Sequence, residues 1–334
     1  MGEVTLSLKA AEDLAADALA RHRTGAENAR EVARALVAAE VDGQRGHGLS
    51  RVPSYAAQAA SGKVDGFAVP RAAPAGAAAL RVDAGHGFAY PALSLAVERL
   101  VALAPETGVA AAAVFNSHHC GVAGHHAERL AEHGLIGLVF ANSPKAIAPW
   151  GGSGALYGTN PIAFAAPRRD AAPLVVDLSL SKVARGKIMV AGKENRAIPE
   201  GWALDAEGRP TTDPEAALAG SMVPMGDAKG AALALIVEIL SAALTGARMG
   251  FEASSFFTAE GDPPGVGQFL LAFAPGPLSG DSFGERIETL IGAILEQPGT
   301  RLPGTRRLDN RARAEAEGIS VPEALHKELV SLAE

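Results

Sequence analysis

The chain has 334 residues, of which 48% are hydrophobic and 20% charged, as in an ordinary globular protein long enough for two or three domains. Its net charge of -7 and aromatic content of 5% exclude the basic and stacking surfaces that nucleic acid needs. The single cysteine, Cys120, excludes an internal disulfide, and no apolar run is long enough to cross a membrane. Because the first residues lack the basic and apolar segments of a signal peptide, a cytoplasmic location is expected.

Helices are expected near both ends of the chain. Apolar residues at helical spacing predict three helical stretches there: 7–21, 27–39 and 283–334. Thr24 and Glu27 have the spacing of a capping box, which would begin the second of these helices. We therefore expect residues 1–75 and 281–334 to form one helical domain made from both chain ends.

The middle of the chain predicts a sheet with helices between its strands. Short apolar runs predict four strands: 109–115, 135–142, 174–178 and 268–275. Helical spacing predicts three helices: 92–103, 126–133 and 228–245. Asp227 is placed to cap the last helix. This order predicts an α/β (mixed α+β) fold in which residues 76–280 form the sheet domain.

His47 and Arg51 lie in residues 43–55, a stretch whose glycines interrupt a helical pattern. If a helix begins after Gly48, His47 lies at its N-terminal end and Arg51 one turn further along the same side. Histidine exchanges protons near neutral pH, and the arginine fork binds a carboxylate with two hydrogen bonds. The pair predicts a site for a small acid, although a helix start with solvated charges remains the alternative.

A second stretch rich in histidine, residues 116–126, leads from a predicted strand into a helix. Gly121 and Gly124 would let a phosphate approach the backbone amides at this junction. Its four histidines also suggest a metal site, but the His-Glu-x-x-His spacing of zinc enzymes is absent. We expect no metal, and histidines that are hydrogen-bonded within the protein or face a cofactor.

Other polar segments allow more than one interpretation. Residues 149–161 are dense in glycine, but no strand precedes them at the spacing of a Rossmann nucleotide loop, so a structured loop is predicted. In residues 176–187, hydroxyl and cationic side chains follow a predicted strand. Lys229 lies in the first turn of a predicted helix, and the turn 301–307 contains three arginines. Each could contact ribose or phosphate, or could be ordinary surface.

In combination these segments resemble the malate/L-lactate dehydrogenase family, which has the sulfolactate dehydrogenase-like fold. The resemblance extends over nearly the whole chain and rests on motifs in one order: His-Gly with Arg51, Trp-Gly-Gly152, Gly-Thr-Asn-Pro161, Ala-Arg-Gly-Lys187, Pro-Glu-Gly-Trp202, Thr-Thr-Asp-Pro214 and Leu-Pro-Gly304. It implies an NAD(P)-dependent oxidoreductase, usually homodimeric, in which residues 76–280 bind cofactor and substrate without a Rossmann fold.

Within the family the chain is most similar to the ketimine reductases, judged by three motifs: Ser-Gly-Lys-Val-Asp-Gly66, Asn-Ser-His-His119 and Gly-Thr-Asn-Pro-Ile-Ala-Phe-Ala-Ala-Pro167. This implies reduction of Δ1-pyrroline-2-carboxylate or Δ1-piperideine-2-carboxylate to L-proline or L-pipecolate, hence a part in proline metabolism. NADPH is favoured over NADH. The alternatives are a malate- or lactate-type dehydrogenase acting on a 2-oxo acid, and an inactive ligand-binding relative.

The resemblance also implies roles for individual residues. His47 would donate the proton and Arg51 would hold the substrate carboxylate, with His119 as the second candidate for acid/base catalysis. Three residues would line the substrate beside Arg51: Thr159, Arg185 and Gly186. The cofactor would be held by a larger set: His119, Cys120, Gly121, Val122, Ala123, Asp177, Leu178, Ser179, Lys229, Arg301, Gly304, Arg306 and Arg307. Gly46 stands where the family commonly has a serine whose hydroxyl is thought to orient the histidine.

Overall fold

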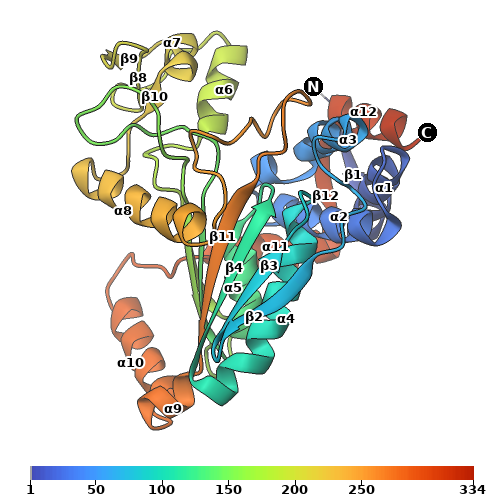
Figure 1. The fold of residues 1–334 in the computed structure, drawn as a ribbon. Coiled ribbons are helices and arrows are strands. Elements are labelled where there is room, and N and C mark those ends of the chain that lie inside the picture. Colours follow the sequence, from blue (N-terminus) through green and yellow to red (C-terminus); the bar gives the residue numbers. More distant parts are fainter. Residues whose placement is uncertain (1) are drawn as a thin grey trace.

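The protein is built around a seven-stranded mixed sheet (Figure 1). Its structure is a computed structural model, which describes residues 2–334 apart from the side chain of Lys193. The strand order is β2-β3-β4-β11-β5-β6-β7, in which β3 and β4 are parallel and the other neighbours antiparallel. The strands are β2 (Arg71–Gly76), β3 (Ala79–Asp83), β4 (Val109–Ser117), β5 (Ile136–Ala141), β6 (Ile162–Ala166), β7 (Leu174–Leu178) and β11 (Val266–Phe273). The mixed α/β fold class is confirmed.

Four strands of this sheet were expected from the sequence, namely β4, β5, β7 and β11, and the observed bounds differ by no more than two residues. The sequence missed β2, β3 and β6. All six residues of β2 are exposed and they include alanine, proline and glycine, so this edge strand carries no hydrophobic alternation. It forms by pairing with β3 alone.

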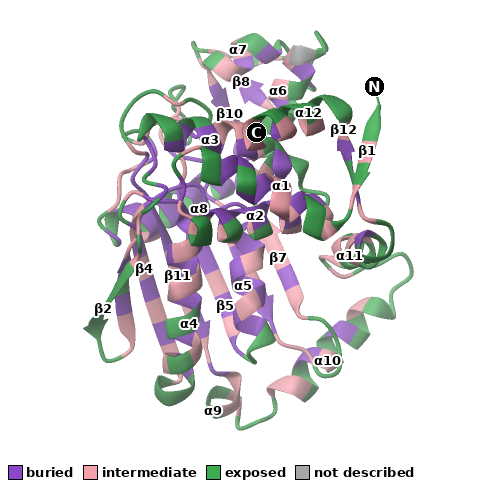
Figure 2. Ribbon diagram, turned by 90° about the vertical axis from the view of Figure 1, so that its right-hand side faces the viewer, coloured by how far each residue is buried: buried purple, intermediate pink, exposed green. Residues whose placement is uncertain are grey.

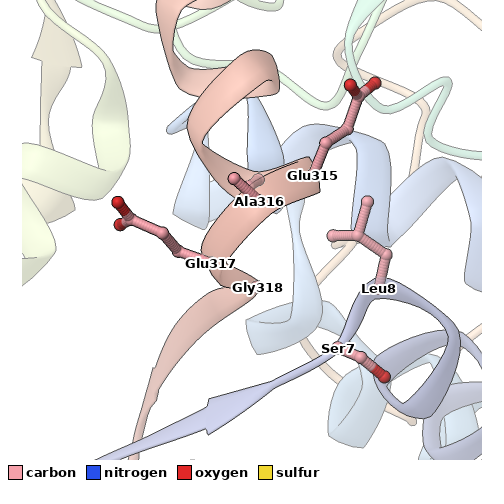
Figure 3. Close-up of a pocket in the computed structure, with 7 residues that line it drawn as sticks. Ser7, Leu8, Glu315, Ala316, Glu317 and Gly318 are labelled. Atoms are coloured by element: carbon pink, nitrogen blue, oxygen red, sulfur yellow. The ribbon is translucent and has the colours of Figure 1, made fainter.

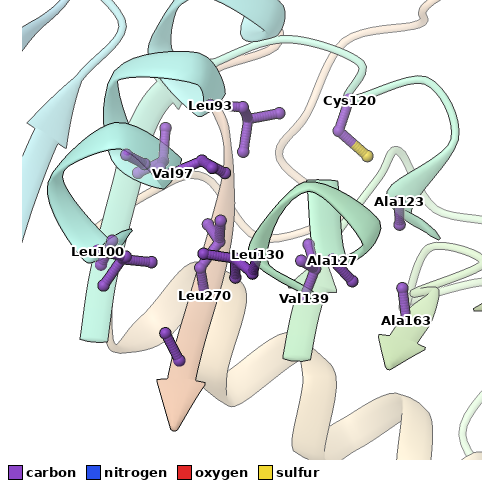
Figure 4. Close-up of a cluster of buried hydrophobic side chains, with 14 of the residues drawn as sticks. Leu93, Val97, Leu100, Cys120, Ala123, Ala127, Leu130, Val139, Ala163 and Leu270 are labelled. Atoms are coloured by element: carbon purple, nitrogen blue, oxygen red, sulfur yellow. The ribbon is translucent and has the colours of Figure 1, made fainter. Parts of the chain in front are cut away.

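Two helices, α4 (Ala89–Thr107) and α5 (Ala123–Glu132), cover one face of the sheet (Figure 4). Leu93 and Leu100 of α4 and Leu130 of α5 are fully buried against the strands, together with Leu270 of β11. Burying a side chain of this size contributes about 2 kcal/mol. Small residues of β4, mostly alanine, allow α4 to approach the sheet closely.

The other face of the sheet carries α8 (Ala228–Glu238), which continues as a π-helical turn, η3 (Ile239–Ala243). Phe269 and Leu271 of β11 pack on this side, opposite to Leu270. The single helix predicted for 228–245 is therefore an α-helix and a π-turn. Asp227 occupies the predicted N-cap position, with φ of 56°, but its side chain accepts no capping hydrogen bond.

Both chain ends meet in a helical group, where strand β1 (Glu3–Leu6) pairs with β12 (Ile319–Pro322) (Figure 1). Its helices are α1 (Leu8–Arg21), α2 (Ala26–Val41), α3 (Val52–Ser61), α11 (Thr305–Glu317) and α12 (Glu323–Ala333). The capping box is wrong: the N-cap of α2 is Gly25, whose N–H donates to the carbonyl oxygen of Gly66, and Thr24 Oγ1 has no hydrogen-bond partner. Packing of Gly66 against this turn shifts the helix start by one residue.

A smaller lobe contributes Ile188 and Met222 to an apolar cluster that it shares with α8 and with the face of the sheet that carries α8. It consists of α6 (Arg185–Lys193), β8 (Ala203–Leu204), β9 (Pro210–Thr211), α7 (Pro214–Ala219) and β10 (Ser221–Met222). At the end of the sheet away from the helical group lie α9 (Pro275–Ser279) and the largely exposed α10 (Phe283–Leu295) (Figure 2). Ile287 and Ile291 of α10 pack with Ala166 of β6. The division into two domains stays a prediction. Among the described residues, no helix is both long and apolar enough to cross a membrane.

Candidate active site

The stretch around His47 and Arg51 folds into two short 3-10 turns, η1 (Arg45–His47) and η2 (Leu49–Arg51), before α3 begins at Val52. The expected helix therefore starts three residues later than predicted. Gly48, with φ of -95° and ψ of -144°, separates the two turns, and a proline in the first turn of α3 favours the later start. Arg51 becomes the N-cap residue of α3, so His47 and Arg51 are held next to a rigid helix.

His47 and His119, which are 72 residues apart in the sequence, meet through their rings. Nδ1 of His47 lies 3.1 Å from Nε2 of His119, and the ring planes differ by 18° with centroids 5.0 Å apart. The two rings are thus nearly parallel and stacked, with these two nitrogens within hydrogen-bond distance. The chain continues inward, because Nδ1 of His119 lies 2.6 Å from the hydroxyl of Tyr55, which is 3.3 Å from the hydroxyl of Tyr90.

Burial keeps both imidazoles neutral. Desolvation, with a further contribution from the positive charge of Arg51, lowers the pKa of His47 from 6.5 to about 4. The same two causes lower the pKa of His119 well below 6.5. A neutral imidazole can accept a proton at one ring nitrogen while it donates at the other. At neutral pH the pair is therefore able to take up a proton from a substrate.

Arg51 has one edge bound and another edge unpaired. Its Nε donates to the carbonyl oxygen of Gly46 at 2.7 Å, and its guanidinium lies over the ring of Phe257, 4.5 Å from the centroid. Nη1 is buried and has no hydrogen-bond partner among the described residues. A buried cationic donor without a partner is costly, so this position favours an anionic ligand such as a carboxylate.

The segment 255–260 holds aromatic side chains against this cluster. The ring centroid of Phe256 is 5.2 Å from that of His119. Lys63 fixes the segment by donating to the carbonyl oxygens of Ser255, Thr258 and Glu260 at 2.7 to 3.0 Å. Lys63 is itself only 3% exposed, so its charge is satisfied by these three carbonyl groups. The segment therefore cannot shift without leaving this lysine unpaired.

Sequence reasoning missed several members of the cluster. Tyr55 and Gln58 follow Arg51 at four and seven residues on one helix, a spacing that could have placed them beside it. Gln58 accepts a hydrogen bond at Oε1, 2.8 Å from Nε2 of His118, and donates to the carbonyl oxygen of Phe256. No local signal connects Phe256 to this site, because its contacts are formed only by the tertiary fold.

The predicted cofactor residues 119–123 form the loop that enters α5. Gly121 has φ of +69°, and a Cβ there would lie 2.7 Å from the hydroxyl of Tyr90, so the close approach requires glycine. The N-cap residue Val122 provides no side-chain cap, which leaves backbone N–H groups at the helix start. Asp177, at the end of β7, accepts the N–H of Gly124 at 2.7 Å. Two predicted cofactor segments are thus brought together.

Arg307 joins the same region through a buried ionic network. It donates to Glu128 of α5 at 3.2 Å, and its Nε is 3.7 Å from Asp42 at the end of α2. Arg311 donates to both oxygens of each of these carboxylates at 2.7 to 2.9 Å. Burial alone would raise the pKa of Asp42, but hydrogen bonds from His125 and Arg311 outweigh it and lower this pKa.

The remaining predicted residues lie outside the histidine cluster. Thr159 is hydrogen-bonded to Ser143, and Arg185 in the small lobe donates to the carbonyl oxygen of Leu218. Ser179 Oγ lies 2.8 Å from Ser181 Oγ, while Cys120 is buried. The exposed members of the predicted sets are Leu178, Gly186, Lys229, Arg301 and Arg306, and Gly304 is half-buried. The roles of all these residues stay predictions.

The structure also has two pockets away from this cluster. One, of about 430 Å³, lies between the start of α1 and the end of α11 and is lined by Ser7, Leu8 and 314–318 (Figure 3). The other, of about 190 Å³, lies near Arg168 and Leu302. Neither is lined by His47, Arg51 or His119.

Comparison with known proteins identifies the family. The family model "Malate/L-lactate dehydrogenase" matches residues 6–330. The (2R)-3-sulfolactate dehydrogenase (NADP(+)) of Chromohalobacter salexigens is 58% identical over 97% of this chain and 96% of that protein. The Δ1-pyrroline-2-carboxylate/Δ1-piperideine-2-carboxylate reductase of Pseudomonas putida is 41% identical over 91% of this chain and 89% of that protein.

Solved structures agree with these relatives. The Δ1-piperideine-2-carboxylate reductase of Pseudomonas syringae superposes with a TM-score of 0.93 at 40% identity, covering 98% of this chain and 99% of that one. The sulfolactate dehydrogenase of Methanocaldococcus jannaschii gives a TM-score of 0.90 at 29% identity, covering 98% and 96%. The resemblance found in the sequence is confirmed: the chain is an oxidoreductase that belongs to the malate/L-lactate dehydrogenase family.

Proposed function

We propose that this protein is an NADP(H)-dependent 2-hydroxy acid dehydrogenase that interconverts (2R)-3-sulfolactate and 3-sulfopyruvate. The observation that carries the proposal is the unpaired Nη1 of Arg51 next to the neutral His47–His119 pair, because it suits a carboxylate beside a proton acceptor. The sulfolactate relative is 58% identical, against 41% for the reductase of Pseudomonas putida, and this difference favours the hydroxy acid over the imine.

Each residue of the cluster has a separate role in the proposed reaction. Arg51 binds the carboxylate of the substrate and thereby orients the C2 carbon and its hydroxyl group. In the oxidation direction His47 accepts the hydroxyl proton at Nε2, and in the reduction direction it returns that proton to the carbonyl oxygen. Nicotinamide, when bound, takes up or supplies the hydride at C2. Phe256 and Phe257 cover the cluster and limit access of water.

The start of α5 fits the phosphate groups of a dinucleotide. Asp177 accepts the N–H of Gly124, but Val122 gives no side-chain cap, and the N-terminus of a helix carries the positive end of its dipole, which favours an anion. Residues 119–123 would hold the diphosphate, and Asp177 lies at the end of the adjacent strand. The exposed Arg306, next to the paired Arg307 in the sequence, is the candidate for contact with the 2′-phosphate of NADP.

Reduction of cyclic ketimine carboxylates is the second candidate function. It is supported by the reductases of two Pseudomonas species at 41% identity and by the TM-score of 0.93 to one solved reductase. The same residues would serve, with Arg51 on the carboxylate and His47 at the imine nitrogen. A part in proline metabolism depends on this second function.

We also propose that the protein is a homodimer that buries the outer face of α8 and η3. An isolated helix that is apolar all round is unsuited to water, and an apolar face complements a second copy of itself. After Lys229, every exposed residue of this face is apolar: Ala232, Leu233, Leu235, Ile236, Ile239, Ala243 and Leu244. Sedimentation of the wild type should give a mass of twice 34.0 kDa, and Ile236→Lys should give the mass of a monomer. Leu278→Lys, at an exposed position of α9, is the control and should stay dimeric.

The proposed role of Arg51 is tested by Arg51→Met. Because Met retains bulk but cannot bind a carboxylate, the KM for 3-sulfopyruvate should rise by about a hundredfold, the effect of losing roughly 3 kcal/mol of charged hydrogen bonding. The KM for NADPH should stay within about twofold, since this change leaves α5 untouched. Arg313→Met, an exposed change on α11, is the matched control. An unchanged KM for the acid would refute the assignment.

A further inference from the structure

Tyr55 is the innermost ring that contacts the catalytic pair. Its side chain is fully buried on α3, between the rings of Phe88 and His118. Its hydroxyl lies 2.6 Å from Nδ1 of His119, closer than any other polar contact of that imidazole. Tyr55 therefore does not touch the proposed substrate, its hydroxyl contacts the loop 119–123 through His119, and it can act on His47 only through that residue.

The positions of the protons along this chain depend on one another. For His47 to accept a proton at Nε2, its own ring proton must be on Nδ1, from which it donates to Nε2 of His119. Nε2 of His119 must then be without a proton, so His119 carries its proton on Nδ1. That proton needs an acceptor, and the hydroxyl oxygen of Tyr55 is the atom within reach.

The alternative tautomers give the opposite result. His119 carries its proton on Nε2, and donates it to Nδ1 of His47, when the Tyr55 hydroxyl donates to Nδ1 of His119; without that hydroxyl this arrangement is the only one that leaves no ring N–H of His119 without an acceptor. His47 would then carry its proton on Nε2, so it could not accept one from a hydroxy acid. Gly46 has no side chain that could prevent this, and a Cβ placed there would have no atom within 4 Å.

We propose that Tyr55 is a positioning residue that makes the reactive tautomer of His47 available by accepting the Nδ1 proton of His119. This inference rests on the proposed function, in which His47 faces the substrate. In oxidation the O–H bond breaks and its proton goes to Nε2 of His47, while the C2 hydrogen leaves with its electron pair as hydride to the oxidised nicotinamide. The imidazolium of His47 keeps its Nδ1 proton, which stays hydrogen-bonded to Nε2 of His119, and no proton passes to Tyr55.

The surroundings of Tyr55 agree with this passive role. Burial raises the pKa of its hydroxyl to about 12, so the group stays neutral at every pH at which the enzyme would work. Its own proton has an acceptor in the hydroxyl of Tyr90, 3.3 Å away. Tyr90 is buried as well, and burial raises its pKa well above 10, so the chain of hydroxyls cannot release a proton at its inner end.

The test compares Tyr55→Phe with Tyr157→Phe, the same change at another buried tyrosine. Loss of the Tyr55 hydroxyl should lower kcat about ten- to hundredfold in both directions, part of the usual contribution of acid–base catalysis, and leave the KM for the acid within about twofold. The ring-nitrogen signals of His119 in ¹⁵N NMR should show a protonated Nδ1 in the wild type and a shift of the proton toward Nε2 in the variant. Tyr157→Phe should change neither.

Two results would overturn the proposal. One is a kcat and pH profile of Tyr55→Phe that match those of the wild type; the other is a wild-type spectrum in which Nε2 of His119 carries the proton. The spectrum of the wild type needs neither turnover nor a folded variant. If the wild type turns over no substrate but its His119 is protonated at Nδ1, the proposed function fails while the tautomer assignment stands.

Discussion

Arg311→Met is the change whose effect on stability follows most directly from the structure. Arg311 makes four hydrogen bonds to Asp42 and Glu128, whose side chains are only 1% and 6% exposed. Without it, two buried carboxylates lose their common partner, although Arg307 and His125 remain in contact with them. Removing one side of a buried ion pair costs about 3–5 kcal/mol, and the remaining partners place this case near 3 kcal/mol.

Thermal unfolding measures this effect. In a chain of this length each kcal/mol lowers Tm by about 2 °C, so Arg311→Met should unfold about 6 °C below the wild type. Arg313→Met is the control, because Arg313 is exposed on the same helix and bonds only to Asn310, and its Tm should change by about 1 °C or less. A Tm for Arg311→Met equal to that of the control would refute the reasoning.

The same comparison has a defined pH dependence. The pKa of Asp42 is lower in the folded protein than its ordinary 3.8, so its stabilisation is complete above that value and is lost as the pH falls through the folded pKa. Protonated Asp42 no longer pairs with Arg311. The Tm difference between wild type and Arg311→Met should therefore narrow below about pH 4.

Two further predictions concern the active site. Because the pKa of His47 is lowered to about 4, kcat/KM for oxidation should stay level down to about pH 5 and decline below it. A decline centred near pH 6.5 would contradict the assignment of His47 as a buried, neutral imidazole. Lys63→Met should destabilise the protein by about 3 kcal/mol through the unpaired carbonyl groups of segment 255–260, and should raise the KM for the acid by freeing Phe257 from Arg51. Lys9→Met, at an exposed lysine of α1, is its control in thermal unfolding and kinetics, and equal effects of the two changes would contradict this role.

Periodicity predicted those elements whose own residues carry the packing signal. The buried strands β4, β5, β7 and β11 have apolar runs, and the positions of α1 and α2 follow from their apolar stripes. By contrast, β2 is held only by its partner strand, and the start of α2 is shifted by Gly66, 41 residues beyond Gly25. Such contacts leave no mark in the local sequence, so the strand was missed and the cap was misplaced.

For the candidate site, residue chemistry indicated the individual groups and the fold supplied their relations. His47, Arg51 and His119 were identified from side-chain type, motif and resemblance, and the structure brings the two histidines within hydrogen-bonding distance. The sequence did not indicate that Tyr55 would lie behind His119, or that Phe257 would cover Arg51. Each of these pairs joins different segments of the chain, and only tertiary packing determines which atoms meet.

The central claim is most directly tested by the loss of reduced-nicotinamide absorbance with the purified protein. Four acids should be compared, each with NADPH and with NADH: 3-sulfopyruvate, oxaloacetate, pyruvate and Δ1-pyrroline-2-carboxylate. We expect rapid loss with 3-sulfopyruvate and NADPH, and a kcat/KM at least about a hundredfold lower with the imine, a difference of roughly 3 kcal/mol. Rapid loss with Δ1-pyrroline-2-carboxylate and none with 3-sulfopyruvate would contradict the claim and establish the ketimine reductase.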